Sequence, residues 1–211
     1  DEELRTYISI IIVATALIWL NVSGLYASAG KGLEIAFFEV SNVITTTGFG
    51  ITDLTVWPLF SQVILLILMF IGGSAGSTAG GFKVMRALIL TKISKNQVLS
   101  SLYPNRVMTI HVNQQPLDKE TQHSVLKYLS LYVTCLLVLT LFLSLDNSDF
   151  MVVASAAAST FNNIGPLLGT DQTFNIFSPF SKLLMSFAMI AGRLEIFPIL
   201  LLFIPKTWSK Y

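Results

Sequence analysis

Apolar residues in this chain gather in four long segments, separated by polar or glycine-rich stretches. The segments cover residues 8–25, 57–71, 125–145 and 180–204, and the second resumes as residues 82–93 after a run of glycines. A helix that crosses a bilayer needs about 20 apolar residues, and several of these segments approach or exceed that length. The pattern therefore predicts long helices that span a membrane.

Two shorter apolar segments lie between the long ones, at residues 33–44 and 149–161. A helix of about 12 residues is only about 18 Å long, which is too short to cross the bilayer. Each short segment leads into a turn that contains glycine, at residues 45–50 and 162–166. We expect two re-entrant helices that enter from one face of the membrane, because such backbone is stable at that depth only when it packs in protein or lines water.

The order of long helix, short helix, glycine-containing turn and long helix occurs twice. Placing Gly48 on Gly165 shifts the chain by 117 residues, overlays the two short segments and brings Thr46 onto Asn163. This periodicity predicts a twofold repeat of membrane units. The first unit, the connection and the second unit are expected at residues 1–97, 98–122 and 123–211.

The composition points to the same class of protein. Of the 211 residues, 53% are hydrophobic and only 12% are charged, and the mean hydropathy is +0.70, whereas a soluble domain has about 25% charged residues. The expected fold class is an all-α polytopic membrane protein with two helix–pore-loop–helix repeats. The single cysteine, Cys135, lies in an apolar segment, so no disulfide can form within the chain.

Charge is distributed unevenly along the predicted spans. Basic residues gather around the connection and at the end of the chain: Lys83, Arg86, Lys92, Lys95, Arg106, Lys119, Lys127, Lys206 and Lys210. The opposite side is mostly acidic, with only Lys31 and Lys182 as basic residues: Glu34, Glu39, Asp53, Asp146, Asp149 and Asp171. By the positive-inside rule the connection is cytoplasmic and the short helices enter from outside. An acidic outer mouth would concentrate cations.

The first turn contains the sequence Thr46-Thr47-Gly48-Phe49-Gly50. Its outline, Thr-x-Gly-aromatic-Gly, is that of a potassium-channel selectivity filter, in which backbone carbonyls replace the water shell of the ion. Glycine permits the dihedrals that turn successive carbonyls inward. The alternative interpretation is a tight, dry re-entrant turn that binds no ligand.

Small residues at 72–81 interrupt the second long segment, and the glycines of this run are Gly72, Gly73, Gly76, Gly80 and Gly81. Their four-residue spacing is compatible with close helix packing. The run Gly72-Gly73-Ser74-Ala75-Gly76 also matches the nucleophile elbow of hydrolases, but that motif follows a strand, and the histidines His111 and His123 lie in or beside the connection. Ten small residues exceed what packing requires, so unwound backbone lining a water-filled cavity is the favoured interpretation. The chain is not expected to be an enzyme.

Arg193 lies about 20 Å into the last predicted helix, where neither membrane surface is within easy reach. A charge at that depth is costly and usually faces a polar interior. A pair with Glu195 is disfavoured because residues two apart on a helix do not face each other. The 117-residue shift places Arg193 opposite Gly76, where a positive charge below a cation filter would raise the barrier to inward passage. The alternative is an ion pair with a carboxylate elsewhere.

These features together resemble the Trk/Ktr/HKT superfamily of potassium uptake proteins, and most of all the pore subunit of the Trk system. The resemblance covers nearly the whole chain, and it rests on the turns 45–50 and 162–166, the small-residue run 72–81 and Arg193. It implies four linked helix–pore-loop–helix units around one pore, of which this chain has the last two. The second turn departs from the channel signature, since Ile164 and Pro166 replace valine and tyrosine.

The resemblance also implies roles for particular residues. The potassium filter would comprise Thr46, Thr47, Gly48, Phe49, Asn163, Ile164 and Gly165, with the ion coordinated chiefly by carbonyls of Thr46, Thr47, Asn163 and Ile164. The run 72–81 would be a flexible gating loop, and Arg193 an electrostatic barrier below the filter. No cofactor is implied besides the transported K⁺.

A ring of about four carbonyl contributors replaces a hydration shell, and this chain supplies two. Either an N-terminal half of the same pore is missing from this chain or two copies must pair, and we expect the missing half. The resemblance further implies a homodimer in the lipid of a bacterial inner membrane, with a TrkA-like cytoplasmic nucleotide-binding regulatory subunit on the basic connection and no nucleic-acid partner. The rival hypothesis is a non-conducting structural or signalling subunit with dry re-entrant loops.

Overall fold

The computed structural model describes residues 1–103, 109–146 and 149–193. Its helices are α1 Glu2–Val22, α2 Ala29–Ile44, α3 Leu59–Ile71, α4 Val84–Leu102, α5 Lys119–Leu143, α6 Phe150–Phe161 and α7 Pro179–Arg193. Its strands are β1 His111–Val112 and β2 Gln115–Pro116. Its short 3-10 helices are η1 Ser23–Leu25, η2 Leu54–Val56 and η3 Phe174–Ile176.

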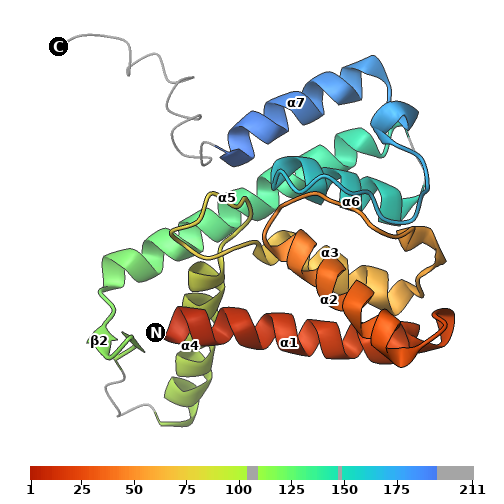
Figure 1. Cartoon of the computed structure of the whole chain (residues 1–211). Helices are drawn as coiled ribbons and strands as arrows, with labels where there is room; N and C mark the ends of the chain where they lie inside the picture. The colour runs from red at the N-terminus through yellow and green to blue at the C-terminus, as the bar shows by residue number, and fades with distance from the viewer. Residues whose placement is uncertain (104–108, 147–148, 194–211) are drawn as a thin grey trace.

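The helices pack in two groups of three (Figure 1). α1, α2 and α3 contact one another, as do α5, α6 and α7. Apolar side chains fill each group, among them Ile18, Val43 and Leu65 in the first and Leu139 and Ala157 in the second. α3 also contacts α6, and α4 contacts both α1 and α5, so the two groups are joined along their inner sides.

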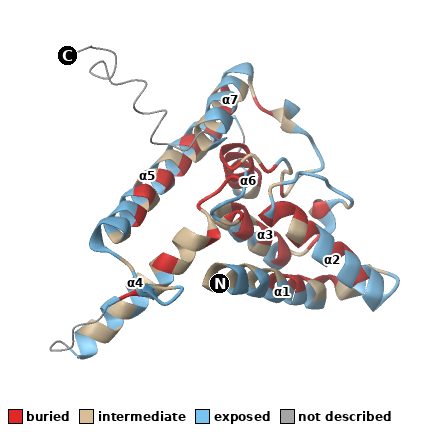
Figure 2. Ribbon diagram, turned by 60° about the vertical axis from the view of Figure 1, so that its left-hand side comes forward, coloured by how far each residue is buried: buried red, intermediate tan, exposed pale blue. Residues whose placement is uncertain are grey.

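The long helices α1 and α5 are exposed along much of their length (Figure 2), and many of the exposed residues are apolar. Leu20 on α1 and Leu137 on α5 are both largely exposed. Glu2–Leu25 and Lys119–Leu143 are the two described stretches that are long and apolar enough to cross a membrane. An apolar outer surface of this kind is what lipid requires. Both helices begin before the predicted segments, because helical hydrogen bonding continues through polar residues that a hydropathy pattern leaves out.

The short helices end where the sequence predicts, at Ile44 and Phe161. The predicted start of the first one, at residue 33, is wrong, because α2 begins at Ala29. Ser28 caps that end by accepting the N–H of Lys31 at 3.2 Å. Gly32 is helical, and a β-carbon there would be in ordinary van der Waals contact with Tyr26 and Trp19, at 3.5 and 3.6 Å.

α3 and α4 are separated by an irregular loop, as the run of small residues predicts. The N–H groups of Phe82 and Lys83 donate to the carbonyls of Phe70 and Ile71, at 3.1 and 2.8 Å. The chain therefore leaves the helix at Gly72 and returns beside its own end. α4 then continues to Leu102, well past the predicted end at residue 93. No glycine or proline interrupts residues 94–102, and the next breaker in the sequence is Pro104.

The connection on the predicted cytoplasmic side contains the hairpin β1–β2. Asn113 and Gln114 have positive φ values of 50° and 66°, as a tight two-residue turn requires. The side-chain oxygen of Asn113 accepts the N–H of Glu2 at 2.7 Å. Lys92 on α4 contacts the Glu2 carboxylate and donates to the carbonyl of His111 at 2.6 Å. The hairpin is thus fixed to the start of α1 and to α4.

Candidate functional site

The two glycine-containing turns have matching backbone conformations. Thr46 and Asn163 have φ values of 56° and 55°, and two residues later Gly48 and Gly165 have values of 88° and 117°. A positive φ at a residue other than glycine is uncommon, so its recurrence at matched positions is informative. The sequence shift of 117 residues superposes both pairs.

The hydrogen bonds that close these turns also match. Thr46 N–H donates to Val43 at 3.1 Å, and Asn163 N–H donates to Thr160 at 3.2 Å. The next residue in each turn, Thr47 or Ile164, donates to a carbonyl five residues before it, at 3.0 and 2.8 Å respectively. Each short helix therefore ends in the same way and directs the chain back along itself.

The fold brings the two turns into contact. A β-carbon at Gly48 would lie 2.6 Å from the carbonyl oxygen of Ile164, and one at Gly165 would lie 3.3 Å from the Cα atom of Gly48. Glycine is thus favoured at both positions because φ is positive there and because the backbones of the two turns approach each other closely. The turns differ in their side chains, since Thr47 is exposed whereas its counterpart Ile164 is buried.

The glycine loop packs against the end of the second short helix. A β-carbon at Gly80 would lie 1.9 Å from the carbonyl oxygen of Asn162, and one at Gly72 would lie 2.2 Å from the carbonyl oxygen of Gly80. Gly73 and Gly81 are buried with them, but Gly76 is exposed and has open space around its Cα atom. The ends of the loop therefore require glycine for packing, whereas its middle does not.

Two buried polar side chains join the loop, α3 and the second turn. Asn162 donates to the carbonyl of Met69 at 2.9 Å. Tyr132 on α5 contacts the carbonyl of Phe70 and the side-chain oxygen of Asn162, at 3.2 and 3.0 Å. The last carbonyls of a helix have no partner within the helix, and Asn162 and Tyr132 satisfy two of those that α3 exposes.

Charged side chains hold the loop from three sides. The Arg193 guanidinium donates to the carbonyl of Thr78 at 2.5 Å, and the Lys83 ammonium donates to the carbonyl of Ser77 at 2.8 Å. A carboxylate oxygen of Glu3, on the first turn of α1, accepts the N–H of Ala75 at 2.6 Å. The loop is therefore fastened to α7, to the start of α4 and to α1.

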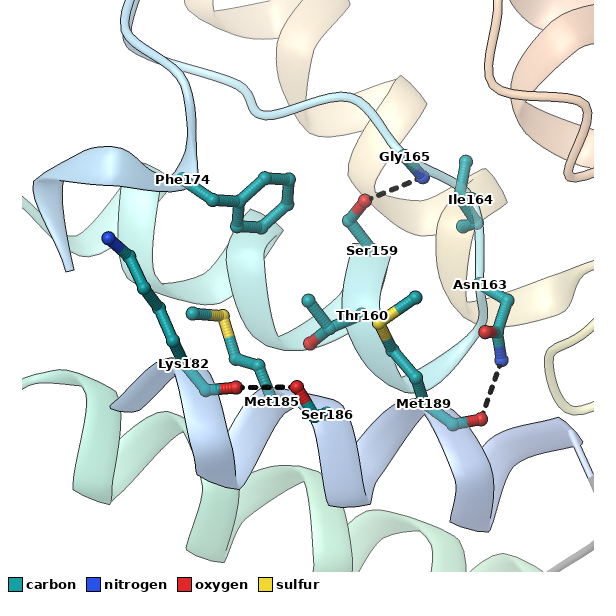
Figure 3. Close-up of a pocket in the computed structure, with 10 residues that line it drawn as sticks. All are labelled: Ser159, Thr160, Asn163, Ile164, Gly165, Phe174, Lys182, Met185, Ser186 and Met189. Atoms are coloured by element: carbon teal, nitrogen blue, oxygen red, sulfur yellow. Dashed lines mark hydrogen bonds between the residues drawn. The ribbon is translucent and has the colours of Figure 1, made fainter. Parts of the chain in front are cut away.

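A pocket of about 370 Å³ lies between α6 and α7 beside the second turn (Figure 3). Asn163 and Ile164 line it from the turn, and Lys182, Met185 and Met189 line it from α7. The Asn163 side chain donates across it to the carbonyl of Met189 at 3.0 Å. The side chain of a proposed filter residue is therefore used to attach the turn to the neighbouring helix.

Among known protein families, the one described as "TrkH: Cation transport protein" matches residues 9–210. The chain belongs to the TrkH family. Its members are cation transport proteins, not enzymes. The hydrolase interpretation of residues 72–76 is therefore excluded, and a helix, α3, stands where that motif needs a strand.

The sequences of individual TrkH-family proteins align with the whole of this chain. It is 36% identical to the Trk system potassium uptake protein TrkH of Escherichia coli K12 and 33% identical to TrkG of the same strain, covering 100% of this chain and 44% of each relative. The crystal structure of the potassium transporter TrkH from Vibrio parahaemolyticus matches with a TM-score of 0.91 and 35% identity, over 99% of this chain and 45% of that one. The chain thus spans less than half the length of these relatives.

Two sequence inferences about the site need correction. Glu39 was assigned to an acidic outer mouth, but its side chain is 0% exposed and lies behind the first turn. The shift of 117 residues holds only as far as the turns, because η3 at Phe174–Ile176 follows η2 at Leu54–Val56 by 120 residues. The extra residues between Gly165 and η3 bring Arg193 opposite Gly73 instead of Gly76. Arg193 contacts the loop nonetheless.

Other predicted features lie outside the described residues, namely Glu195, Arg106, Lys206 and Lys210. Sequence reasoning missed most of the polar side chains that support the turns and the loop: Glu3, Asn42, Tyr132, Ser155, Ser159 and Asn162. One signal was available for the first turn. Glu39 and Asn42 lie three residues apart in the short helix that leads into this turn, and polar groups on one face within a membrane usually point to function.

Proposed function

We propose that this chain forms part of a potassium-selective pore in a full-length membrane transporter. The observation that carries the proposal is the contact between two turns of the same backbone conformation, each at the end of a short helix. Relatives of this family are potassium uptake proteins by name. Backbone carbonyls at such turns can take the place of the hydration shell of the ion.

The proposed pore consists of helix–pore-loop–helix repeats, with α1–α2–α3/α4 as one unit and α5–α6–α7 as the next. Two turns supply about half of a coordinating ring. The relatives are more than twice as long as this chain, so the rest of the ring would come from other parts of the full-length protein. The ion would be bound by carbonyls of Thr46, Thr47, Asn163 and Ile164, with Gly48, Phe49 and Gly165 completing the filter.

The proposed gate is the loop at residues 72–81. Irregular backbone at membrane depth is stable where it packs on protein or lines water, and this loop has buried ends and an exposed middle. Arg193 would act both as an electrostatic barrier and as an attachment point for the loop, because its positive charge lies at the loop and its hydrogen bond to Thr78 holds the loop in place. Movement of the loop would require that bond to break.

The setting proposed for the full-length protein is the bacterial inner membrane, as a homodimer surrounded by lipid. A cytoplasmic nucleotide-binding regulatory subunit would contact the basic connection, where the hairpin β1–β2 is joined to α1 and α4. A signal at the hairpin would then reach the loop through Glu3, which lies beside Glu2 on the first turn of α1.

The test is rubidium and potassium uptake into liposomes that contain the full-length protein. Gly48→Asp should abolish selective uptake, because the new side chain meets the carbonyl oxygen of Ile164 and adds a carboxylate to the filter. Gly24→Asp is the matched control, since a β-carbon there meets nothing within 4 Å. Selective uptake that persists in Gly48→Asp would refute the filter. A wild type that conducts no cation would favour the dry, non-conducting subunit.

A further inference from the structure

The first turn is held from behind by two polar residues of α2. Glu39 and Asn42 lie three residues apart on the face of α2 that faces the returning chain, and both are buried. The side-chain oxygen of Asn42 accepts the N–H of Phe49 at 2.7 Å, and a carboxylate oxygen of Glu39 accepts the N–H of Ile51 at 3.1 Å. The Asn42 amide and the second Glu39 oxygen are 3.5 Å apart, so the two side chains form one unit.

These bonds determine where the carbonyls of the turn point. A trans peptide unit is planar, and its N–H and C=O groups point in opposite directions. None of the described peptide bonds is cis. Since the N–H of Phe49 points at Asn42, the carbonyl of Gly48 in the same unit points away from α2. By the same geometry the N–H of Ile51 directs the carbonyl of Gly50 away from the helix.

The second turn uses different side chains for the same purpose. The hydroxyl oxygen of Ser159 accepts the N–H of Gly165 at 2.9 Å, and that of Ser155 accepts the N–H of Leu168 at 2.9 Å. Ser159 is the counterpart of Asn42 in the 117-residue register. The counterpart of Phe49 is Pro166, which has no N–H to donate. An asparagine would therefore find no donor there, and the shorter serine binds the N–H one residue earlier.

The two turns are thus held by different acceptors. Among the described residues, an amide oxygen and a carboxyl oxygen lie behind the first turn, whereas two hydroxyl oxygens lie behind the second. We propose that Glu39 and Asn42 are positioning residues that set the preference of the pore for K⁺ over Na⁺, by preventing the carbonyls of the first turn from closing around the smaller ion. This inference rests on the proposed function of the turns as a filter.

The test compares variants of the full-length protein in liposomes, using the ratio of K⁺ to Na⁺ uptake. Glu39→Ala and Asn42→Ala should each lower the ratio by about tenfold, as expected when a buried N–H group loses its hydrogen-bond acceptor. Glu39→Gln should retain most of the selectivity, because its amide oxygen still accepts the N–H of Ile51. Glu34→Gln is the matched control, since Glu34 is exposed on the same helix and pairs with Lys31 at 3.0 Å.

The outcomes separate this inference from the proposed function. A selective wild type with unchanged ratios in Glu39→Ala and Asn42→Ala would overturn the positioning role and leave the filter standing. A wild type without K⁺ uptake would refute the filter itself. If Glu39→Ala fails to fold, Asn42→Ala still decides the question, because it removes the acceptor of the Phe49 N–H. A purely structural role would lower the amount of folded protein and leave the ratio of the folded fraction unchanged.

Discussion

At the scale of single residues, most of the side chains that support the turns and the loop do so by hydrogen-bonding to backbone groups. Asn162 satisfies the carbonyl of Met69, Glu39 receives the N–H of Ile51, and Arg193 donates to the carbonyl of Thr78. In each case the backbone is irregular or at a helix end, where its polar groups lack partners within an element. These side chains therefore fix backbone conformations that the membrane would otherwise penalise.

Arg193→Ala should raise inward K⁺ flux by about tenfold, which corresponds to about 1.4 kcal/mol of barrier. The substitution removes a positive charge from the proposed pathway and frees the carbonyl of Thr78. Flux in liposomes at several membrane potentials is the measurement. Arg193→Lys keeps the charge and should show a smaller increase. Lys182→Ala, near the other end of α7, serves as a control. Unaltered flux in Arg193→Ala would remove the barrier role.

At the scale of elements, the loop between α3 and α4 is an excursion from a helix, closed by backbone bonds at its base. Its buried ends contact Asn162, and its middle is exposed. The loop thus combines a fixed attachment with a part that has few packing contacts, and weakly packed segments are those that move most readily. This arrangement suits a gate better than helix packing alone, which would bury the middle as well.

A pair of loop variants tests this division. Gly80→Ala should destabilise the protein by about 1–3 kcal/mol and alter flux, because its β-carbon would overlap the carbonyl of Asn162. Gly76→Ala should change stability by less than about 0.5 kcal/mol, since nothing lies within 4 Å of the new methyl group. Thermal unfolding in detergent is the measurement, together with rubidium uptake. Equal effects of the two substitutions would contradict the assignment of fixed ends and a free middle.

At the scale of the whole molecule, hydrogen bonds near both ends of the long helix α5 attach neighbouring elements to one another. On the predicted cytoplasmic side the hairpin is attached to α1 and α4. On the opposite side, Asp146 after α5 accepts the N–H of Ser178 just before α7 at 2.9 Å. Hydrogen bonds from Ser181 and Ser178 hold the pKa of Asp146 below its usual range.

Lowering the pH should weaken the hydrogen bonds that Asp146 accepts from Ser178 and Ser181 before it affects the apolar interior of the protein. These bonds form a junction between the end of α5 and the start of α7. A carboxylate with a lowered folded-state pKa contributes stability that is complete above its unfolded pKa of about 3.9 and is lost as the pH falls through the lower folded value. The melting temperature in detergent should therefore fall below about pH 4, and Asp146→Asn should flatten that part of the profile. Asp171→Asn is the control. An unchanged profile in Asp146→Asn would show that the junction does not contribute.

Much of the architecture follows from the order of apolar and small residues. The ends of both short helices at Ile44 and Phe161, the interruption at Gly72 and the equivalence of Thr46 with Asn163 were all predicted from it. These features depend on local chemistry, since helix ends and left-handed turns are set by a few neighbouring residues. Helix starts were predicted less well, because a capping residue such as Ser28 has no apolar signal.

The order of apolar, polar and small residues was enough to predict the membrane class, the alternation of long and short helices, and the two turns with glycine at matched positions. Only the tertiary structure decided that Gly48 lies against Ile164, that Glu39 is behind the first turn instead of at an outer mouth, and that Arg193 reaches Thr78 from a register shifted by the longer second loop. Periodicity along the sequence reflects local backbone geometry, so it indicates which face of its own helix a residue occupies. The partner of a buried polar group depends instead on packing between elements that are distant in the chain.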